Sequence, residues 1–143
     1  MSENDLKLLG LMRRAGALVP GESGTGDTVR AGKAKLLLLA ADASENAQKR
    51  AESFLNGRRA LCVALPYTKE EIASHVGLNS CSMAAVTDLG FADALMSSLA
   101  QQWPERYQAD AAEVRRRLER AKRRSGKAAA ERKKSIGKRR TNV

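Results

Sequence analysis

Aromatic residues, cysteines and long apolar runs are all scarce in this chain of 143 residues. Aromatics make up 3% of the sequence, so a core has to be built from Leu, Val, Ile and Ala. Two cysteines are too few for a disulfide framework, and they form no CxxC metal motif. The longest apolar run, LLLLAA, is far too short to span a bilayer, and the first residues do not resemble a signal peptide. We therefore expect a cytoplasmic protein with reduced thiols.

Positive charge is plentiful, but it is confined to one end of the chain. Residues 113–143 hold 14 of the 26 Lys and Arg and 3 of the 16 Asp and Glu, a net charge of +11. The other 112 residues carry a net charge of −1. The basic character of the whole chain therefore belongs to the C-terminal segment, and the remainder is close to neutral.

The first hundred residues alternate between helical and strand periodicity. Segments 35–42 and 60–65 are typical of buried strands, and 83–88 is a third strong strand. Ser44, and Thr68 with Glu71, are typical of helix starts. This order predicts a three-layer α/β/α sandwich with a small mixed sheet. We expect it to occupy residues 1–104, followed by a basic extension at 105–143 that is partly helical and then disordered.

The segment VPGESGTGDTVRAG, residues 19–32, resembles a phosphate-binding loop with an altered key position. Gly21 and Gly26 bracket four residues, and Thr28 stands where such a loop binds magnesium. The position that requires Lys is Asp27, whose carboxylate would repel a polyphosphate. We therefore favour a glycine turn that leads into a weak helix. Small residues there would let RNA approach the positive end of the helix dipole, or would simply form a tight turn.

Three segments in register resemble a known family. LLGLMRRAGALVPGE, VRAGKAKLLLLAADAS and GLNSCSMAAVTDLGFADAL are similar to the bacterial YlxQ-like branch of the ribosomal protein L-seven-Ae family. The resemblance covers residues 6–99. It implies a small α/β/α sandwich that binds kink-turn RNA, and association with the ribosome through ribosomal or other structured RNA.

The resemblance implies RNA contact in two segments. The first contains Gly21, Glu22, Ser23, Gly24, Asp27, Arg30 and Lys33, and the second contains Leu78, Asn79, Ser80, Cys81 and Ser82. Leu78 or Met83 would pack against the flipped-out nucleotide of the kink. This sequence departs from the family in the first segment: Ser23 is shorter than usual, Gly24 has no side chain, and Asp27 replaces a Lys.

The basic extension offers a second route to RNA, through attraction to phosphates that does not depend on base sequence. We expect phosphate contacts from Arg115, Arg116, Arg117, Lys122, Arg123, Arg124, Arg132, Lys133 and Lys134. Two alternatives remain open. One is a protein-interaction module of the same fold whose RNA affinity lies mainly in the extension, and the other is a nucleotide-binding enzyme.

The remaining reactive side chains do not form a catalytic pattern. His75 is the only histidine and is expected to be structural, and Cys62 lies in an apolar strand and is expected in the core. Cys81, in the second RNA segment, is the candidate for an exposed thiol. We therefore expect no enzyme activity, no cofactor and no metal.

Overall fold

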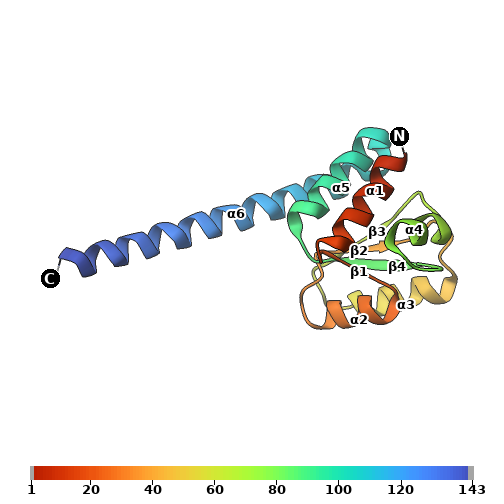
Figure 1. Cartoon of the computed structure of the whole chain (residues 1–143), viewed down its shortest axis with the longest axis horizontal. Coiled ribbons are helices and arrows are strands. Elements are labelled where there is room, and N and C mark those ends of the chain that lie inside the picture. Colours follow the sequence, from red (N-terminus) through yellow and green to blue (C-terminus); the bar gives the residue numbers. More distant parts are fainter. Residues whose placement is uncertain (1, 142–143) are drawn as a thin grey trace.

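The structure, a computed structural model, describes the backbone of residues 2–141 and the side chains of residues 4–126 (Figure 1). In the described part of the chain, the elements are α1 (Ser2–Arg14), β1 (Leu18–Pro20), α2 (Glu22–Arg30), β2 (Leu36–Leu39), α3 (Glu45–Leu55), β3 (Leu61–Ala64), α4 (Lys69–Val76), β4 (Met83–Val86), α5 (Leu89–Gln102) and α6 (Pro104–Thr141). Helix α3 begins at the Ser44 cap, and α4 begins at the capping box of Thr68 and Glu71, both as predicted.

The four strands form one mixed sheet in the order β1-β4-β2-β3. β4 pairs antiparallel with both β1 and β2, and β2 pairs parallel with β3. All four residues of β4 are buried, which fits its place inside the sheet. At the edge, β3 exposes every second residue, so Cys62 is exposed. The prediction that Cys62 lies in the core was wrong, because an edge strand with one solvent-facing side also reads as an apolar run.

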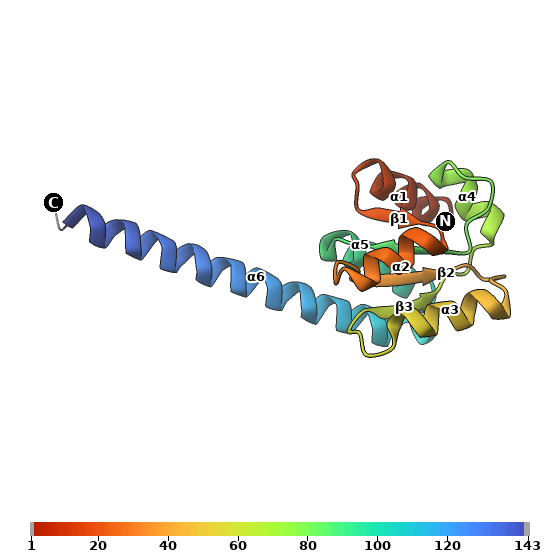
Figure 2. The same ribbon diagram turned by 90° about the horizontal axis from the view of Figure 1, so that it is seen from below.

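Helices cover both faces of the sheet, which confirms the predicted three-layer α/β/α fold (Figures 1 and 2). On one face, Leu37 and Met83 pack with Val29 of α2 and with alanines of α3. On the other face, Leu36 and Leu38 pack with the helices α1, α4 and α5. Alternate residues of β2 therefore supply the two cores, as the period of a strand requires.

The first turns of α6 belong to the folded body. Tyr107 and Val114 are buried in the larger core. The Tyr107 hydroxyl also donates a hydrogen bond to the carbonyl oxygen of Ala64, at 2.6 Å. A chain that ended at residue 104 would lose both core side chains, so the body extends at least to Val114.

Beyond the body, the backbone of α6 continues as a helix to Thr141 and projects away from the sandwich (Figure 1). The sequence predicts disorder over 127–143, because this run has no apolar stripe, and helices take most of their stability from packing. The side chains from residue 127 onward lie outside the described part, so the expected disorder in isolation stays a prediction. None of the described helices is long and apolar enough to cross a membrane.

A buried carboxylate ties the first helix to the last part of the body. Asp5 of α1 is fully buried and accepts hydrogen bonds from the Tyr67 hydroxyl at 2.5 Å and from the Gln102 amide at 2.9 Å. The Ser98 hydroxyl donates a third hydrogen bond to it. Burial and the hydrogen bond to Asp5 raise the pKa of Tyr67. The carboxylate is thus stabilised by neutral donors from α5 and from the segment before α4.

Replacing Asp5→Ala is expected to lower the free energy of unfolding by about 2–4 kcal/mol, because one buried and two partly buried donors lose their acceptor. Urea denaturation followed by circular dichroism measures this change. The neighbouring Asn4→Ala, at an exposed position of the same helix, should change stability by less than about 0.5 kcal/mol. Equal effects of the two variants would contradict a structural role for the buried carboxylate.

Candidate nucleic-acid interface

The sheet brings the two predicted RNA segments together. Pro20 of β1 lies opposite Ala84 of β4 in the antiparallel register. The next residue, Gly21, donates its backbone N–H to the carbonyl oxygen of Met83 at 2.8 Å. The start of α2 therefore lies beside the segment that leads into β4. We call residues 21–23 and 78–80 together the α2–β4 edge.

The start of α2 leaves its first backbone amides free of a side-chain cap. Gly21 is the N-cap, with a φ of 96° that favours glycine, and no side chain accepts from the first turn. Ser23 is exposed in this turn. Glu22 forms an ion pair with Arg50 of α3 at 3.1 Å. The unpaired amides and the positive end of the helix dipole together favour an acceptor or anion at this point.

The other small residues of α2 serve packing within the protein. A Cβ on Gly24 would lie 2.6 Å from Cγ1 of Val19, and a Cβ on Gly26 would lie 2.8 Å from the Phe54 ring. Thr25 is fully buried. The expectation that Gly24 and Gly26 leave room for RNA was therefore wrong. The close approach for which they are needed is that of α2 to its own neighbours.

The backbone of residues 19–32 does not have the conformation of a phosphate-binding loop. Residues 22–30 are helical, and the Thr28 hydroxyl donates to the carbonyl oxygen of Gly24 at 2.7 Å. A helix does not wrap around a phosphate as a loop does. In the described side chains, moreover, no group of His, Cys, Asp or Glu is arranged to hold a metal ion. The weak helix predicted for this segment is confirmed.

The charged residues of α2 lie along its exposed side. Asp27 forms an ion pair with Arg30 at 2.6 Å, so the carboxylate is partly neutralised. Arg30 ends α2, and its side chain lies over the Phe54 ring. Lys33 is exposed and follows the helix. Arg30 and Lys33 are therefore at the far end of α2 from the α2–β4 edge.

The second segment is only partly exposed. Leu78 is 36% exposed, and Asn79 and Ser80 are exposed beside it. Cys81 is buried, and its thiol donates to the carbonyl oxygen of Met83 at 3.3 Å. Burial raises the pKa of this thiol. The expectations of an accessible Cys81, and of an apolar contact from the buried Met83, were therefore wrong.

Ser82, an expected RNA contact, and His75, expected to be structural, both make contacts within the protein. The carbonyl oxygen of Ser82 accepts the backbone N–H of Ala40 at 2.9 Å, so this backbone joins the sheet. The Nδ1 atom of His75 lies 3.1 Å from the carbonyl oxygen of Glu71 on the preceding turn. That contact fits the structural role expected for the histidine.

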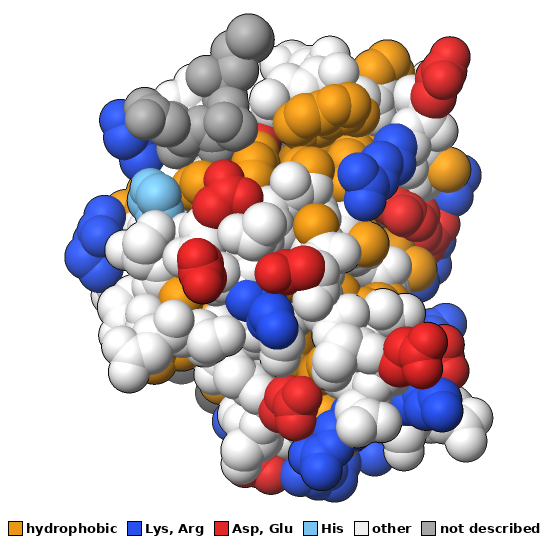
Figure 3. Space-filling view, turned by 90° about the vertical axis from the view of Figure 1, so that its right-hand side faces the viewer, with side chains coloured by type: hydrophobic (Ala, Val, Ile, Leu, Met, Phe, Trp, Pro, Cys, Tyr) orange, Lys and Arg blue, Asp and Glu red, His pale blue; other side chains and the backbone are white. Residues whose placement is uncertain are grey.

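The end of the molecule that holds α4 carries both acidic and basic side chains (Figure 3). Figure 3 looks onto this end, the right-hand side of Figure 1. Among the residues drawn in colour, acidic and basic side chains are mixed, and apolar ones lie between them. The coloured part of this end therefore does not present a patch of one charge sign.

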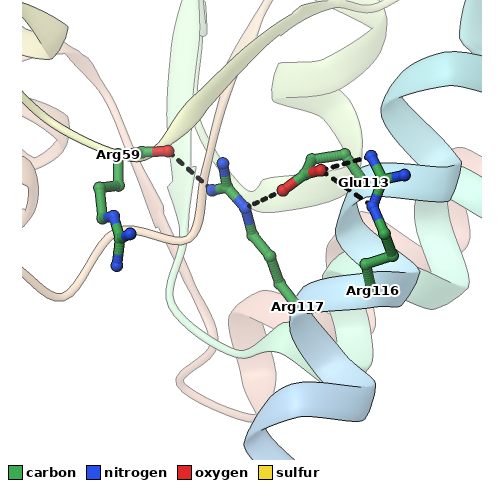
Figure 4. Close-up of polar contacts among 4 residues, drawn as sticks. All are labelled: Arg59, Glu113, Arg116 and Arg117. Atoms are coloured by element: carbon green, nitrogen blue, oxygen red, sulfur yellow. Dashed lines mark hydrogen bonds and ion pairs between the residues drawn. The ribbon is translucent and has the colours of Figure 1, made fainter.

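Several α6 arginines that were expected to contact phosphates form ion pairs within the protein. Arg115 forms an ion pair with Asp93 at 2.7 Å, and Arg116 and Arg117 share Glu113 at 2.6 and 2.7 Å (Figure 4). Hydrogen bonds from these two arginines lower the pKa of Glu113 to about 2. Lys122, Arg123 and Arg124 are exposed, and no ion pair is seen for them among the described side chains. Arg132, Lys133 and Lys134 lie outside the residues whose side chains are described.

The fold defines the class to which the chain belongs, an α/β/α sandwich on a mixed four-stranded sheet. It is similar to the structure of a protein of unknown function from Bacillus halodurans C, with a TM-score of 0.59, 25% identity, and 65% of this chain and 93% of that chain covered. The 15.5kD RNA-binding protein of Giardia lamblia has the same fold, with a TM-score of 0.53 and 15% identity over 67% of this chain and 82% of that one.

Sequence comparison identifies the family. The chain is 38% identical over 96 residues to the RNA-binding protein YlxQ of Bacillus subtilis, which covers 64% of this chain and 91% of the relative. It is 34% identical over 87 residues to the protein of the same name from Enterococcus faecium, with 61% and 82% covered. No family model matches the chain. The chain belongs to the YlxQ family.

Replacing Gly24→Ala is expected to destabilise the fold by about 1–3 kcal/mol, because the new methyl group overlaps Val19. The sign is diagnostic, since alanine in a helix is otherwise favoured by about 1 kcal/mol over glycine. Urea denaturation gives the value. The exposed neighbour Ser23→Ala is the control and should stay within about 0.5 kcal/mol of the parent chain. A Gly24→Ala variant as stable as the parent would show that the packing tolerates a side chain.

Proposed function

We propose that this protein is a non-enzymatic RNA-binding protein, and that it recognises structured RNA of the kink-turn type through the α2–β4 edge. The observation that supports the proposal is the hydrogen bond between the backbone of Gly21 and Met83, which joins the start of α2 to the start of β4. Those are the places where the family resemblance implies RNA contact. The names of the YlxQ relatives support RNA as the partner.

The edge offers the groups that such an RNA requires. The free amides of the first turn of α2 meet phosphate or base acceptors, and the Ser23 hydroxyl reaches a base edge. Leu78 packs against an unstacked nucleotide, and Asn79 and Ser80 donate and accept hydrogen bonds around it. No nucleophile, general base or metal is needed for this role.

The exposed cations of α6 strengthen the complex without reading sequence. Lys122, Arg123 and Arg124 lie outside the edge and attract phosphates through counterion release. Ribosomal RNA, which is rich in structured elements, is the partner class that we propose, with the ribosome in the cytoplasm as the place of action.

A second candidate function is a protein-interaction module with the same fold. Two observations favour it: the mixed charges on the end that holds α4, and the exposed Asp27 carboxylate on α2. In that case the RNA affinity would reside mainly in the basic helix α6, and the folded face would bind a protein.

Recognition at the edge is tested by replacing Ser23→Asp in the full chain. A carboxylate in the first turn of α2 favours the helix dipole, so the fold is retained, but it repels the RNA backbone. We expect binding of a kink-turn RNA to weaken by about tenfold, a cost near 1.4 kcal/mol. Fluorescence anisotropy at fixed salt measures the change.

The control for that variant is Asn4→Asp, which places the same charge in the first turn of α1. The control RNA has its sheared G·A pairs replaced by Watson–Crick pairs, so that only shape differs. A parent chain that binds both RNAs equally, with no effect of Ser23→Asp, would refute kink-turn recognition.

The two candidate functions are separated by the replacement Asp27→Lys. If the exposed side of α2 contacts RNA, the Asp27 carboxylate repels the RNA phosphates. Replacing it with a cation should then raise kink-turn affinity by roughly tenfold at low salt. The control is Glu52→Lys, the same charge reversal at an exposed position of α3. Equal gains in both variants would indicate general attraction only, and would favour the protein-interaction module.

A further inference from the structure

A basic cleft lies between α6 and the turn that joins α3 to β3. Its volume is about 490 Å³. Six cationic side chains line it: Lys35, Arg58, Arg59, Arg117, Arg120 and Arg124. Among the described residues, Glu113 is the one carboxylate in the lining, so the described lining carries a net charge of +5. It is formed by the starts of β2 and β3, whereas the α2–β4 edge is formed where β1 ends and β4 begins.

The cleft is a composite of segments that are distant in sequence. Nη1 of Arg117 on α6 donates to the carbonyl oxygen of Arg59 at 2.7 Å, and Nε of the same side chain donates to the Glu113 carboxylate (Figure 4). Arg58 donates to the carbonyl oxygen of Arg30 at the end of α2, at 3.3 Å. These contacts fix the two walls relative to each other and define the position of the remaining cations.

Most of the charge in the cleft is uncompensated. Within residues 4–126, Lys35, Arg59, Arg120 and Arg124 have no ion-pair partner, and all four are exposed. The rest of the described lining consists of small and apolar residues, including Gly32 and Gly57.

We propose that this cleft binds the phosphate backbone of RNA. It lies at one end of the strands, and the α2–β4 edge lies at the other end. Several guanidinium groups in one cleft match the charge and the geometry of phosphate oxygens. The occupant is a polymer rather than a nucleotide because the positive charge continues beyond the cleft. From residue 124 to Thr141 the α6 backbone runs on for roughly 26 Å at 1.5 Å per residue. The sequence there contributes Lys127, Arg132, Lys133 and Lys134.

The proposal shares one premise with the proposed function, namely that the polyanion is RNA. It differs in what is read, because a backbone site does not distinguish kinked from regular RNA. The two can therefore fail separately. Ser23→Asp should reduce the preference for kink-turn RNA, while removal of the cleft cations should weaken the binding of all RNAs alike.

The first test is the triple replacement Lys35→Gln, Arg59→Gln and Arg120→Gln in the full chain. The side chains of these residues make no ion pair among the described residues, so the fold should keep its urea midpoint. Binding of a regular RNA duplex is measured over a range of salt. The slope of log affinity against log salt should fall by roughly 2–3, at about 0.7–0.9 for each phosphate that the variant no longer neutralises.

The matched control removes three cations elsewhere on the body, by Lys7→Gln, Arg14→Gln and Lys49→Gln. These positions are exposed and lie outside the cleft. Their removal lowers the net charge by the same amount, so it measures general attraction. Equal slopes for the two triple variants would overturn the proposal.

The second test raises affinity, so loss of folding cannot mimic it. Glu113→Gln removes the carboxylate in the cleft, which should tighten duplex binding by about threefold to tenfold at low salt. Glu119→Gln removes a carboxylate from the same helix outside the cleft lining and should have a smaller effect. Equal effects would argue against the site. So would 1:1 binding of ATP that competes with the duplex, because the cleft would then be a nucleotide site.

Discussion

The antiparallel pairing of β4 with β1 on one side and β2 on the other positions everything else in this protein. β4 is buried throughout, and two of its four residues are alanines, so helices on both faces can approach closely. Its first residue, Met83, accepts the backbone N–H of Gly21 at the start of α2. The helix α5 follows its end, and α5 supports the first turns of α6. Both candidate RNA surfaces therefore depend on the register of one short strand.

The two surfaces work by different physics. At the α2–β4 edge, backbone amides, hydroxyls and one leucine offer directional contacts with little net charge, which suits the reading of shape. In the cleft, several cationic side chains offer strong electrostatic attraction to phosphates of any base sequence. Salt weakens the second kind of contact far more than the first. A protein that carries both can hold RNA through its charge while selecting among RNAs through the edge.

The sequence predicted the layers and the strands because those depend on local pattern. The run LLLL was predicted as a strand buried on both faces, and MAAVTD as a further strand; the structure confirms both as strands inside the sheet. Cys62 was misplaced because the edge position of β3 is set by pairing that a single run does not reveal. Gly24 and Gly26 were misread because glycine permits close approach by any neighbour, whether RNA or Val19. The cleft was missed altogether, since Lys35, Arg59 and Arg120 come together only through tertiary packing.

The buried carboxylate of Asp5 has a consequence for how the chain reaches its fold during synthesis. It accepts a hydrogen bond from the side-chain amide of Gln102, which lies 97 residues further along the chain. The first helix is made early, yet its polar anchor is completed only when α5 has been synthesised. Until then a charged group and the apolar face around Leu9 remain exposed on the nascent chain, and contacts of such long range form slowly. Helix α1 can therefore complete its buried contacts only after α5 has been synthesised.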